Sequence, residues 1–143
     1  MDELFGMPTD FEIKLMPWWI RLFAPSNTYV TFWGTLYCPD KVALDYISRN
    51  DYVPRSLFVH EACHVKQQRA RGNLLWHLGY AFFKTYRYGQ ELYAYAVQLN
   101  YLISLGLKPD IPAFAKSLSN KDVYGYAVTY NKALKDLKEL LNA

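Results

Sequence analysis

The segment from Arg55 to Arg71 constrains the fold more than any other, because no proline or glycine interrupts it between Pro54 and Gly72. Proline is tolerated in the first turn of a helix, and glycine suits the left-handed residue that closes one. Arg69 and Arg71 would interact favourably with the carbonyl end of the helix dipole. We therefore predict one long helix here, against which the rest of the chain must pack.

The chain before Pro39 is predicted to be extended. Phe11–Leu15 alternates apolar and charged side chains, which is the period of a half-buried strand. Thr28–Trp33 and Thr35–Tyr37 are rich in β-branched and aromatic residues, and Gly34 between them is interpreted as a bulge. These runs predict a small N-terminal antiparallel sheet.

The chain after Pro39 is predicted to be helical. Asp40 is the expected N-cap of a helix over Lys41–Arg49. Beyond the long helix, further helices are expected over Leu74–Tyr86, Gln90–Leu105, Pro112–Leu118 and Lys121–Leu141, the last of them amphipathic. The fold class is therefore α+β and mostly helical, in a single domain over residues 1–143.

The long helix carries His60-Glu61-Ala62-Cys63-His64, an H-E-x-x-H motif. Residues four apart lie on one face of a helix, so both imidazoles can bind one ion. Glu61 is turned about 100° from His60 around the helix, which places its carboxylate beside the ion rather than on it. From there it can take a proton from a zinc-bound water, whose pKa the metal lowers to about 7. The motif predicts Zn²⁺ as the cofactor, His60 and His64 as ligands, and Glu61 as the catalytic residue.

A third ligand is expected downstream of the motif. Catalytic zinc often uses two histidines and one glutamate and leaves the fourth position to water. Glu91 begins a predicted helix, and Ala94 one turn later would let that helix approach the motif helix closely. His77 is the alternative, but it lies in the apolar run Leu75–Leu78, which favours a core position. We therefore favour Glu91 as the third metal ligand.

The run from Ser56 to Gln68 resembles small gluzincin-type metallopeptidases that bear the motif H-E-x-x-H-x-x-Q-Q. Members continue with a Tyr/Arg-rich stretch and a Glu-Leu-x-Ala-Tyr segment that supplies the third ligand, and the counterparts here are Tyr86–Tyr88 and Glu91–Tyr95. The resemblance spans residues 28 to 98, and it includes Tyr37-Cys38-Pro39, which is similar to the edge strand that pairs with an extended substrate. It implies a zincin-like fold and a bacterial or phage source. Cys63 departs from the family pattern and is predicted to be a buried, inert thiol.

Several side chains near the motif could assist the chemistry. Tyr93, Tyr95 and Arg87 are candidates for stabilising an oxyanion beside zinc. Gln67 and Gln68 are candidates for orienting a ligand imidazole, because a metal-bound histidine usually donates its other N–H. The alternatives are core packing for the tyrosines and a solvated helix surface for the glutamines.

Charge and hydropathy exclude several classes. The formal net charge of +3 is too small to indicate a nucleic-acid partner, and two cysteines cannot build a disulfide framework. The longest apolar stretch, Leu74–Phe83, is shorter than the roughly 20 residues that cross a bilayer, so no membrane span is predicted. No signal-peptide pattern is seen, and a cytoplasmic location is expected. In Met16–Phe23, tryptophan beside arginine suits a membrane interface, but core packing is favoured.

The predicted function is zinc-dependent hydrolysis of peptide bonds, with Glu61 as the general base. A peptide or protein substrate would add to the sheet edge near Thr31–Tyr37. One alternative is a zinc amidase that acts on cell-wall peptides. Another is a catalytically silent interaction module in which zinc pins two helices, with Cys63 or His77 as a fourth ligand. A latent enzyme, covered by its N-terminal residues or its C-terminal helix, is also compatible with the sequence. The oligomeric state stays open.

Overall fold

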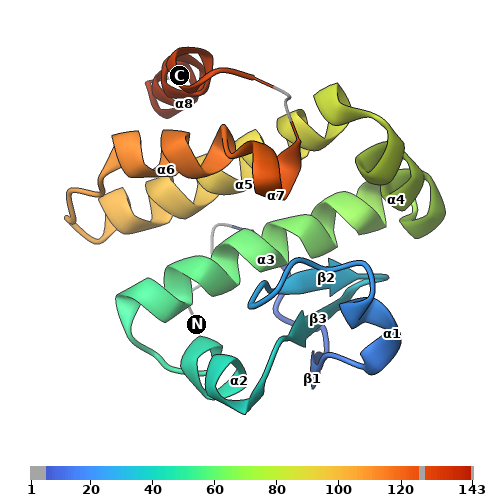
Figure 1. The fold of residues 1–143 in the computed structure, drawn as a ribbon. Helices are drawn as coiled ribbons and strands as arrows, with labels where there is room; N and C mark the ends of the chain where they lie inside the picture. The colour runs from blue at the N-terminus through green and yellow to red at the C-terminus, as the bar shows by residue number, and fades with distance from the viewer. Residues whose placement is uncertain (1–5, 126–127, 143) are drawn as a thin grey trace.

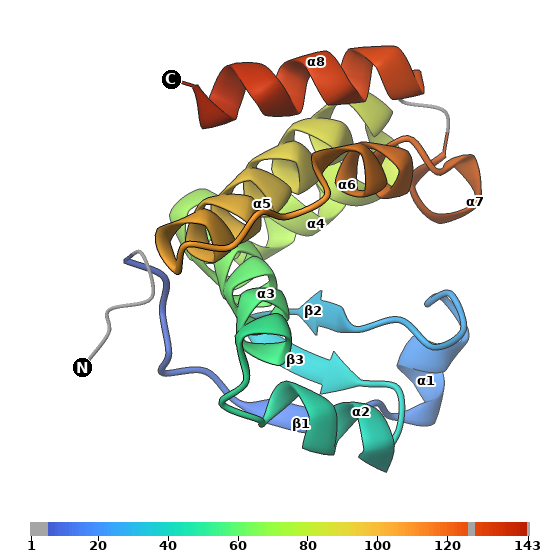
Figure 2. The ribbon, with the colours of Figure 1, turned by 90° about the vertical axis from the view of Figure 1, so that its left-hand side faces the viewer.

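The computed structural model describes residues 6–125 and 128–142. Its strands are β1 (Ile13–Leu15), β2 (Val30–Phe32) and β3 (Thr35–Cys38). Its helices are α1 (Trp18–Arg21), α2 (Lys41–Ile47), α3 (Tyr52–Arg71), α4 (Asn73–Phe82), α5 (Lys84–Ser104), α6 (Ile111–Leu118), α7 (Lys121–Tyr124) and α8 (Tyr130–Leu141). Helix α3 runs between the sheet on one side and α5 and α6 on the other (Figures 1 and 2). The α+β class and the predominance of helix are confirmed.

The sheet is mixed, so the prediction of an antiparallel sheet is wrong for one of its two pairings. Strands β2 and β3 form an antiparallel hairpin in which Thr31 lies opposite Leu36. Strand β1 pairs in parallel with the other side of β3, and Ile13 also lies opposite Leu36. The strand order is therefore β1-β3-β2, because α1 and the loop after it carry the chain past the position of β3. This order makes β2 an edge strand.

The hairpin turns at Trp33 and Gly34, so the interpretation of Gly34 as a bulge is wrong. The φ angles of the two residues are 52° and 76°, and positive φ at both central positions is typical of a type I′ hairpin turn. The second position favours glycine, because the left-handed region is costly for residues with a Cβ. The turn places Trp33 at the exposed tip of the hairpin.

Gln68 anchors this hairpin to α3. Its side chain is fully buried. Its Oε1 accepts from the backbone N–H of Gly34 at 2.8 Å, and its Nε2 donates to the carbonyl of Thr31 at 2.9 Å. Burial and these two hydrogen bonds hold the Gln68 side chain in one orientation, in which it joins α3 to the hairpin.

We expect Gln68→Leu to destabilise the protein, because it keeps the volume but leaves the buried carbonyl of Thr31 and the partly buried N–H of Gly34 without their partner. Each such group costs about 1–3 kcal/mol, so the free energy of unfolding should fall by about 2–4 kcal/mol in urea titrations of the metal-free protein. Asn131→Leu, on the exposed side of α8, is the matched control and should stay within about 0.5 kcal/mol. Equal effects of the two substitutions would contradict the anchoring role.

Helices α4 and α5 meet at Phe83, not near Gly89 as predicted. Phe83 is extended, with φ −117° and ψ 103°, and α5 then continues through Gly89 without a break. Glycine inside a helix costs only about 1 kcal/mol, which the burial of one side of α5 outweighs. Gly79 permits the close approach of the two helices, because a Cβ there would lie 2.8 Å from the ring of Tyr86. The expected boundaries at Tyr86 and Gln90 are therefore wrong.

The expected helix over Lys121–Leu141 is two helices, α7 and α8. Helix α7 ends at Gly125, whose φ of 71° lies outside the right-handed helical region. Residues 126 and 127 of the expected helix lie outside the described part of the chain. Helix α8 buries Ala133 and Leu137 against α5 and α6, as its amphipathic pattern predicts (Figure 2).

Helices α3 and α5 pack closely where both carry small side chains. Ala62 and Cys63 of α3 share a buried cluster with Ala94 of α5, which confirms the expected close approach. The Cys63 thiol is fully buried, and burial raises its pKa to about 12. It is therefore protonated at neutral pH and packs as an apolar group, as predicted.

The segment around α1 is only half buried. Met16 and Ile20 belong to the core, in agreement with the core-packing interpretation. Trp18, Leu22 and Phe23 are 73%, 70% and 85% exposed and Trp19 is 40% exposed, so for these four the interpretation is wrong. None of the helices in the described part of the chain is long and apolar enough to cross a membrane.

Candidate metal centre

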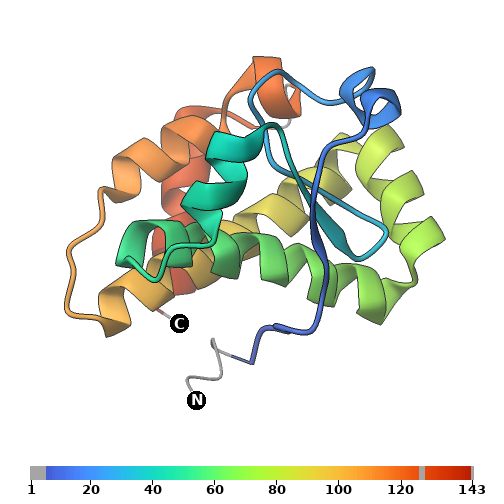
Figure 3. The ribbon, with the colours of Figure 1, turned by 90° about the horizontal axis from the view of Figure 1, so that it is seen from below.

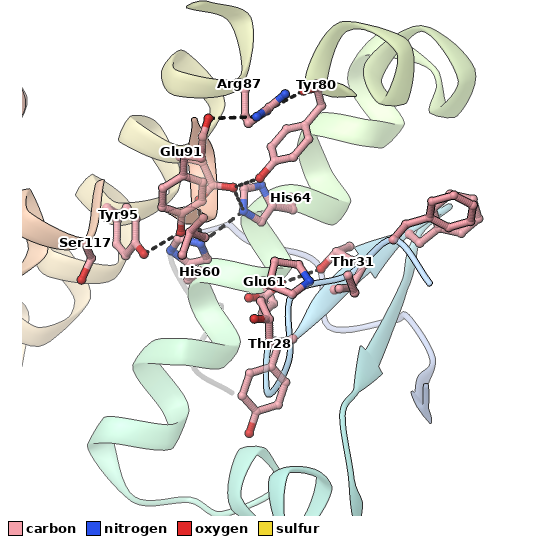
Figure 4. A pocket seen from close by; sticks show the side chains of 18 of the residues that line it. Thr28, Thr31, His60, Glu61, His64, Tyr80, Arg87, Glu91, Tyr95 and Ser117 are labelled. Carbon is pink, nitrogen blue, oxygen red and sulfur yellow. Dashed lines mark hydrogen bonds and ion pairs between the residues drawn. The ribbon is translucent and has the colours of Figure 1, made fainter. Parts of the chain in front are cut away.

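Helices α3 and α5 bring His60, His64 and Glu91 together at the base of a cleft (Figure 4). The two Nε2 atoms are 3.2 Å apart. The Glu91 carboxylate lies 3.4 Å from His60 Nε2 through Oε2 and 3.3 Å from His64 Nε2 through Oε1. All three side chains are buried. The helical spacing of the motif and the packing of α5 on α3 thus produce one compact group of donor atoms.

This donor set fits a zinc ion. Two imidazole nitrogens and a carboxylate oxygen are typical zinc ligands, and here the ligand atoms all lie within 4.8 Å of one another. The group also favours a positive charge: burial opposes protonation of His64, yet the nearby Glu91 carboxylate outweighs it and raises the pKa to about 9. Conversely, burial raises the pKa of Glu91, but the two histidines outweigh it and hold the pKa well below its usual value. A cation bound between these side chains would supply the charge that a proton supplies here.

Gln67 orients one of the imidazoles. Its Nε2 donates to the carbonyl of Gln90 at 3.0 Å, which directs its Oε1 toward His64 Nδ1 at 2.9 Å. Because an amide oxygen only accepts, His64 carries its proton on Nδ1 when Nε2 faces an ion. Of the two candidate glutamines, Gln67 contacts His64, whereas Gln68 binds the hairpin instead.

Tyr80 orients the carboxylate. Its hydroxyl donates to Glu91 Oε1 at 2.5 Å. Burial and the Glu91 charge both hold the pKa of Tyr80 well above its usual value, so the hydroxyl keeps its proton. The sequence offered no signal for this contact, because Tyr80 is one of 13 tyrosines and lies on a different helix from its partner.

Glu61 lies beside His60, His64 and Glu91 and does not belong to their group of donor atoms. Its Oε2 accepts from Thr31 Oγ1 of β2 at 2.7 Å, and both side chains are buried. It lines the same cleft as His60 and His64. Strand β2 therefore holds the Glu61 carboxylate in the position that the turn angle along α3 predicts.

The three candidates for oxyanion stabilisation have different environments. Tyr95 lines the cleft, with its ring centroid 4.5 Å from that of His60 and its hydroxyl 2.9 Å from the hydroxyl of Tyr124. Arg87 also lines the cleft, but its guanidinium donates to the carbonyls of Tyr80, Ala81 and Tyr124, which makes it a structural link between α4 and α7.

Tyr93 is half exposed and does not line the cleft. It follows Glu91 by two residues, which turns it by about 200° to the other side of α5. Tyr95 is therefore the one of the three whose side chain both lines the cleft and contacts His60.

The two alternative ligands lie apart from the centre. His77 Nδ1 donates to the carbonyl of Asn73 at 2.6 Å, and its Nε2 accepts from the backbone N–H of Trp33 at 3.3 Å. It therefore links α4 to the hairpin turn at the rim of the cleft. Cys63 lies in the α3–α5 core. Within residues 6–125 and 128–142, no fourth histidine, cysteine or carboxylate joins the group of His60, His64 and Glu91.

The cleft has a volume of about 890 Å³ and lies between the sheet and the helices after α4. Thr31 and Phe32 line one side, and Tyr95, Phe114 and Tyr124 line the other. No residue of α8 lines it, so in the described structure the C-terminal helix does not cover the site. The cleft is open to a ligand, and His60, His64 and Glu91 all line it.

Comparison of the chain with protein-family models, curated proteins and solved structures finds no match.

Proposed function

We propose that the protein is a zinc-dependent hydrolase of peptide bonds. The observation that carries the proposal is the convergence of His60, His64 and Glu91 on one point, with Glu61 beside them in an open cleft. Structural zinc sites are closed by four protein ligands, whereas catalytic ones use three and leave a position open. Three ligands at the base of a cleft therefore favour catalysis over the silent interaction module.

The protein side chains would divide the work between binding and proton transfer. His60, His64 and Glu91 would hold the ion, which supplies Lewis-acid chemistry that acidifies water and polarises a carbonyl. Glu61 would take one proton from the attacking water, whose oxygen bonds to the carbonyl carbon. As the C–N bond breaks, Glu61 would return that proton to the departing amine. The hydrogen bond from Thr31 holds the carboxylate for both transfers.

The substrate would bind along the residues just before Thr31 and not, as the sequence predicted, along Thr31–Tyr37. Strand β3 is central and pairs on both sides, so it offers no free edge. The carbonyl of Thr31 is already bonded to Gln68. The stretch from Thr28 to Val30 lines the cleft, and we propose that an extended peptide pairs with its backbone there.

A hydrolysis screen tests the proposal. Zinc-loaded protein would be incubated with denatured casein, with a mixed peptide library and with cell-wall muropeptides, and new termini would be read by mass spectrometry. We expect cleavage that a chelator abolishes and that added zinc restores. Cleavage confined to cell-wall muropeptides would support the alternative function of a cell-wall amidase instead of a general peptidase. If the zinc-loaded protein hydrolyses none of these substrates, the proposal fails in favour of the silent module.

A further inference from the structure

Exposed apolar side chains gather at one end of the molecule. Trp18, Leu22 and Phe23 of α1 and the loop after it, and Leu75, Leu78 and Phe82 of α4, are all exposed, and together we name them the apolar face. Helices α1 and α4 lie at the same end of the molecule in two perpendicular views (Figures 1 and 3). Single exposed apolar residues are ordinary, but a group of this kind marks an interaction surface.

Aromatic contacts join the two helices that carry the apolar face. The Trp19 ring of α1 packs edge-on against Phe32 of β2 at 5.6 Å between centroids. Phe32 in turn packs against His77 of α4 at 4.7 Å. Trp19, Phe32 and His77 also line the cleft, so the apolar face adjoins its mouth.

Helix α4 turns apolar side chains toward solvent, where a surface helix is expected to carry polar ones. It contains no charged residue. Its inner side is covered through Trp76, and about half a turn away Leu74, Leu75, Leu78 and Phe82 form an exposed arc of about 100°. A surface helix normally turns polar and charged side chains, and not an apolar arc, toward solvent. In the described structure the outer side of α4 is open to solvent.

The segments that form the apolar face carry only positive charge. No aspartate or glutamate occurs in residues 15–39 or 62–90, whereas six lysines and arginines do, one of which, Arg69, is paired with Asp10. Arg71 and Lys84 are exposed just before and just after α4. An apolar helix with basic residues at both ends and tryptophans beside it matches the surface of an anionic bilayer, where phosphate groups meet the cations and indole rings lie at headgroup depth.

We propose that the apolar face docks on anionic lipid bilayers, with α4 lying in the plane of the interface. A second copy of the chain is a poorer occupant, because a two-fold contact between identical patches brings Arg71 and Lys84 of both copies close together. Docking would place the mouth of the cleft at the lipid surface. The contact uses no metal-binding residue, so it stands independently of the proposed hydrolysis.

Vesicle flotation with the full-length protein tests this inference. We expect binding to phosphatidylcholine vesicles that contain about one third phosphatidylglycerol, and binding at least about tenfold weaker to pure phosphatidylcholine. The double variant Leu22→Ser/Phe82→Ser should lower the partition coefficient at least about tenfold, because two inserted side chains are lost. Its matched control is Val42→Ser/Leu105→Ser, which changes two exposed apolar residues outside the apolar face and should bind like the parent.

A second pair of variants tests the contribution of positive charge to vesicle binding. Arg71→Gln/Lys84→Gln should lower binding to the anionic vesicles about tenfold, whereas Lys135→Gln/Lys138→Gln on α8 should not change it. Chelation of metal should leave binding unchanged, which separates this result from the hydrolysis assay. Equal binding of the Leu22→Ser/Phe82→Ser variant and the parent would overturn the proposal. So would absence of binding to anionic vesicles, or a parent dimer that this variant converts to a monomer without any vesicle binding.

Discussion

Glu91→Ala is expected to remove bound zinc, whereas the parent and His77→Ala should each hold about one zinc per chain. Glu91 contributes the carboxylate that faces both imidazoles, at 3.3 and 3.4 Å. Without it only the two imidazoles remain, and the affinity should fall by more than the roughly 100-fold that loss of a supporting residue causes. Plasma mass spectrometry after dialysis against trace zinc would measure the metal content, and competition with a fluorescent chelator would measure the affinity.

His77→Ala is the matched control, because it removes a histidine at the rim of the same cleft. Its loss breaks the contacts to Asn73 and Trp33 but no contact to the three ligands. Circular dichroism of each variant would show that the helices are retained. Zinc kept by Glu91→Ala and lost by His77→Ala would refute the ligand set. A parent that takes up no zinc on reconstitution would reduce the centre to a hydrogen-bonded pair of histidines with their carboxylate.

Glu61→Gln is expected to keep zinc and lose hydrolysis. An amide has the shape of the carboxylate and can still accept the hydrogen bond from Thr31 Oγ1, so the local geometry should persist. It cannot accept a proton at neutral pH, and loss of a general base costs about 10²–10⁴-fold in rate. The measurement is kcat/KM on a peptide that the parent cleaves, together with the zinc content of the same sample.

Glu139→Gln provides the control for this substitution, because it makes the same chemical change on the exposed surface of α8. It should leave both kcat/KM and zinc content unchanged. Full activity of zinc-loaded Glu61→Gln would show that another group accepts the proton. Loss of zinc together with activity would instead place Glu61 among the ligands.

Proline and glycine as markers of helix boundaries predicted α3 well and α5 poorly, for a physical reason. Pro54 and Gly72 bracket a segment whose own residues favour helix, and α3 covers Tyr52–Arg71. At Gly89 the local preference opposes the tertiary structure, because α5 buries Tyr88 and Glu91 on either side of the glycine. Burial of these neighbours outweighs the cost of one glycine. Local preference therefore predicts a boundary only where packing agrees with it.

The sequence by itself determined that His60 and His64 share one face and that Glu61 lies beside it, because the period of a helix follows from its own backbone hydrogen bonds. Only the tertiary structure decided which distant side chains meet that face. Thr31 holds Glu61, Tyr80 holds Glu91, and Gln67 rather than its neighbour Gln68 reaches His64. These contacts depend on how a strand and two helices pack against α3. Packing is a property of the whole core, and no local pattern in the chain encodes it.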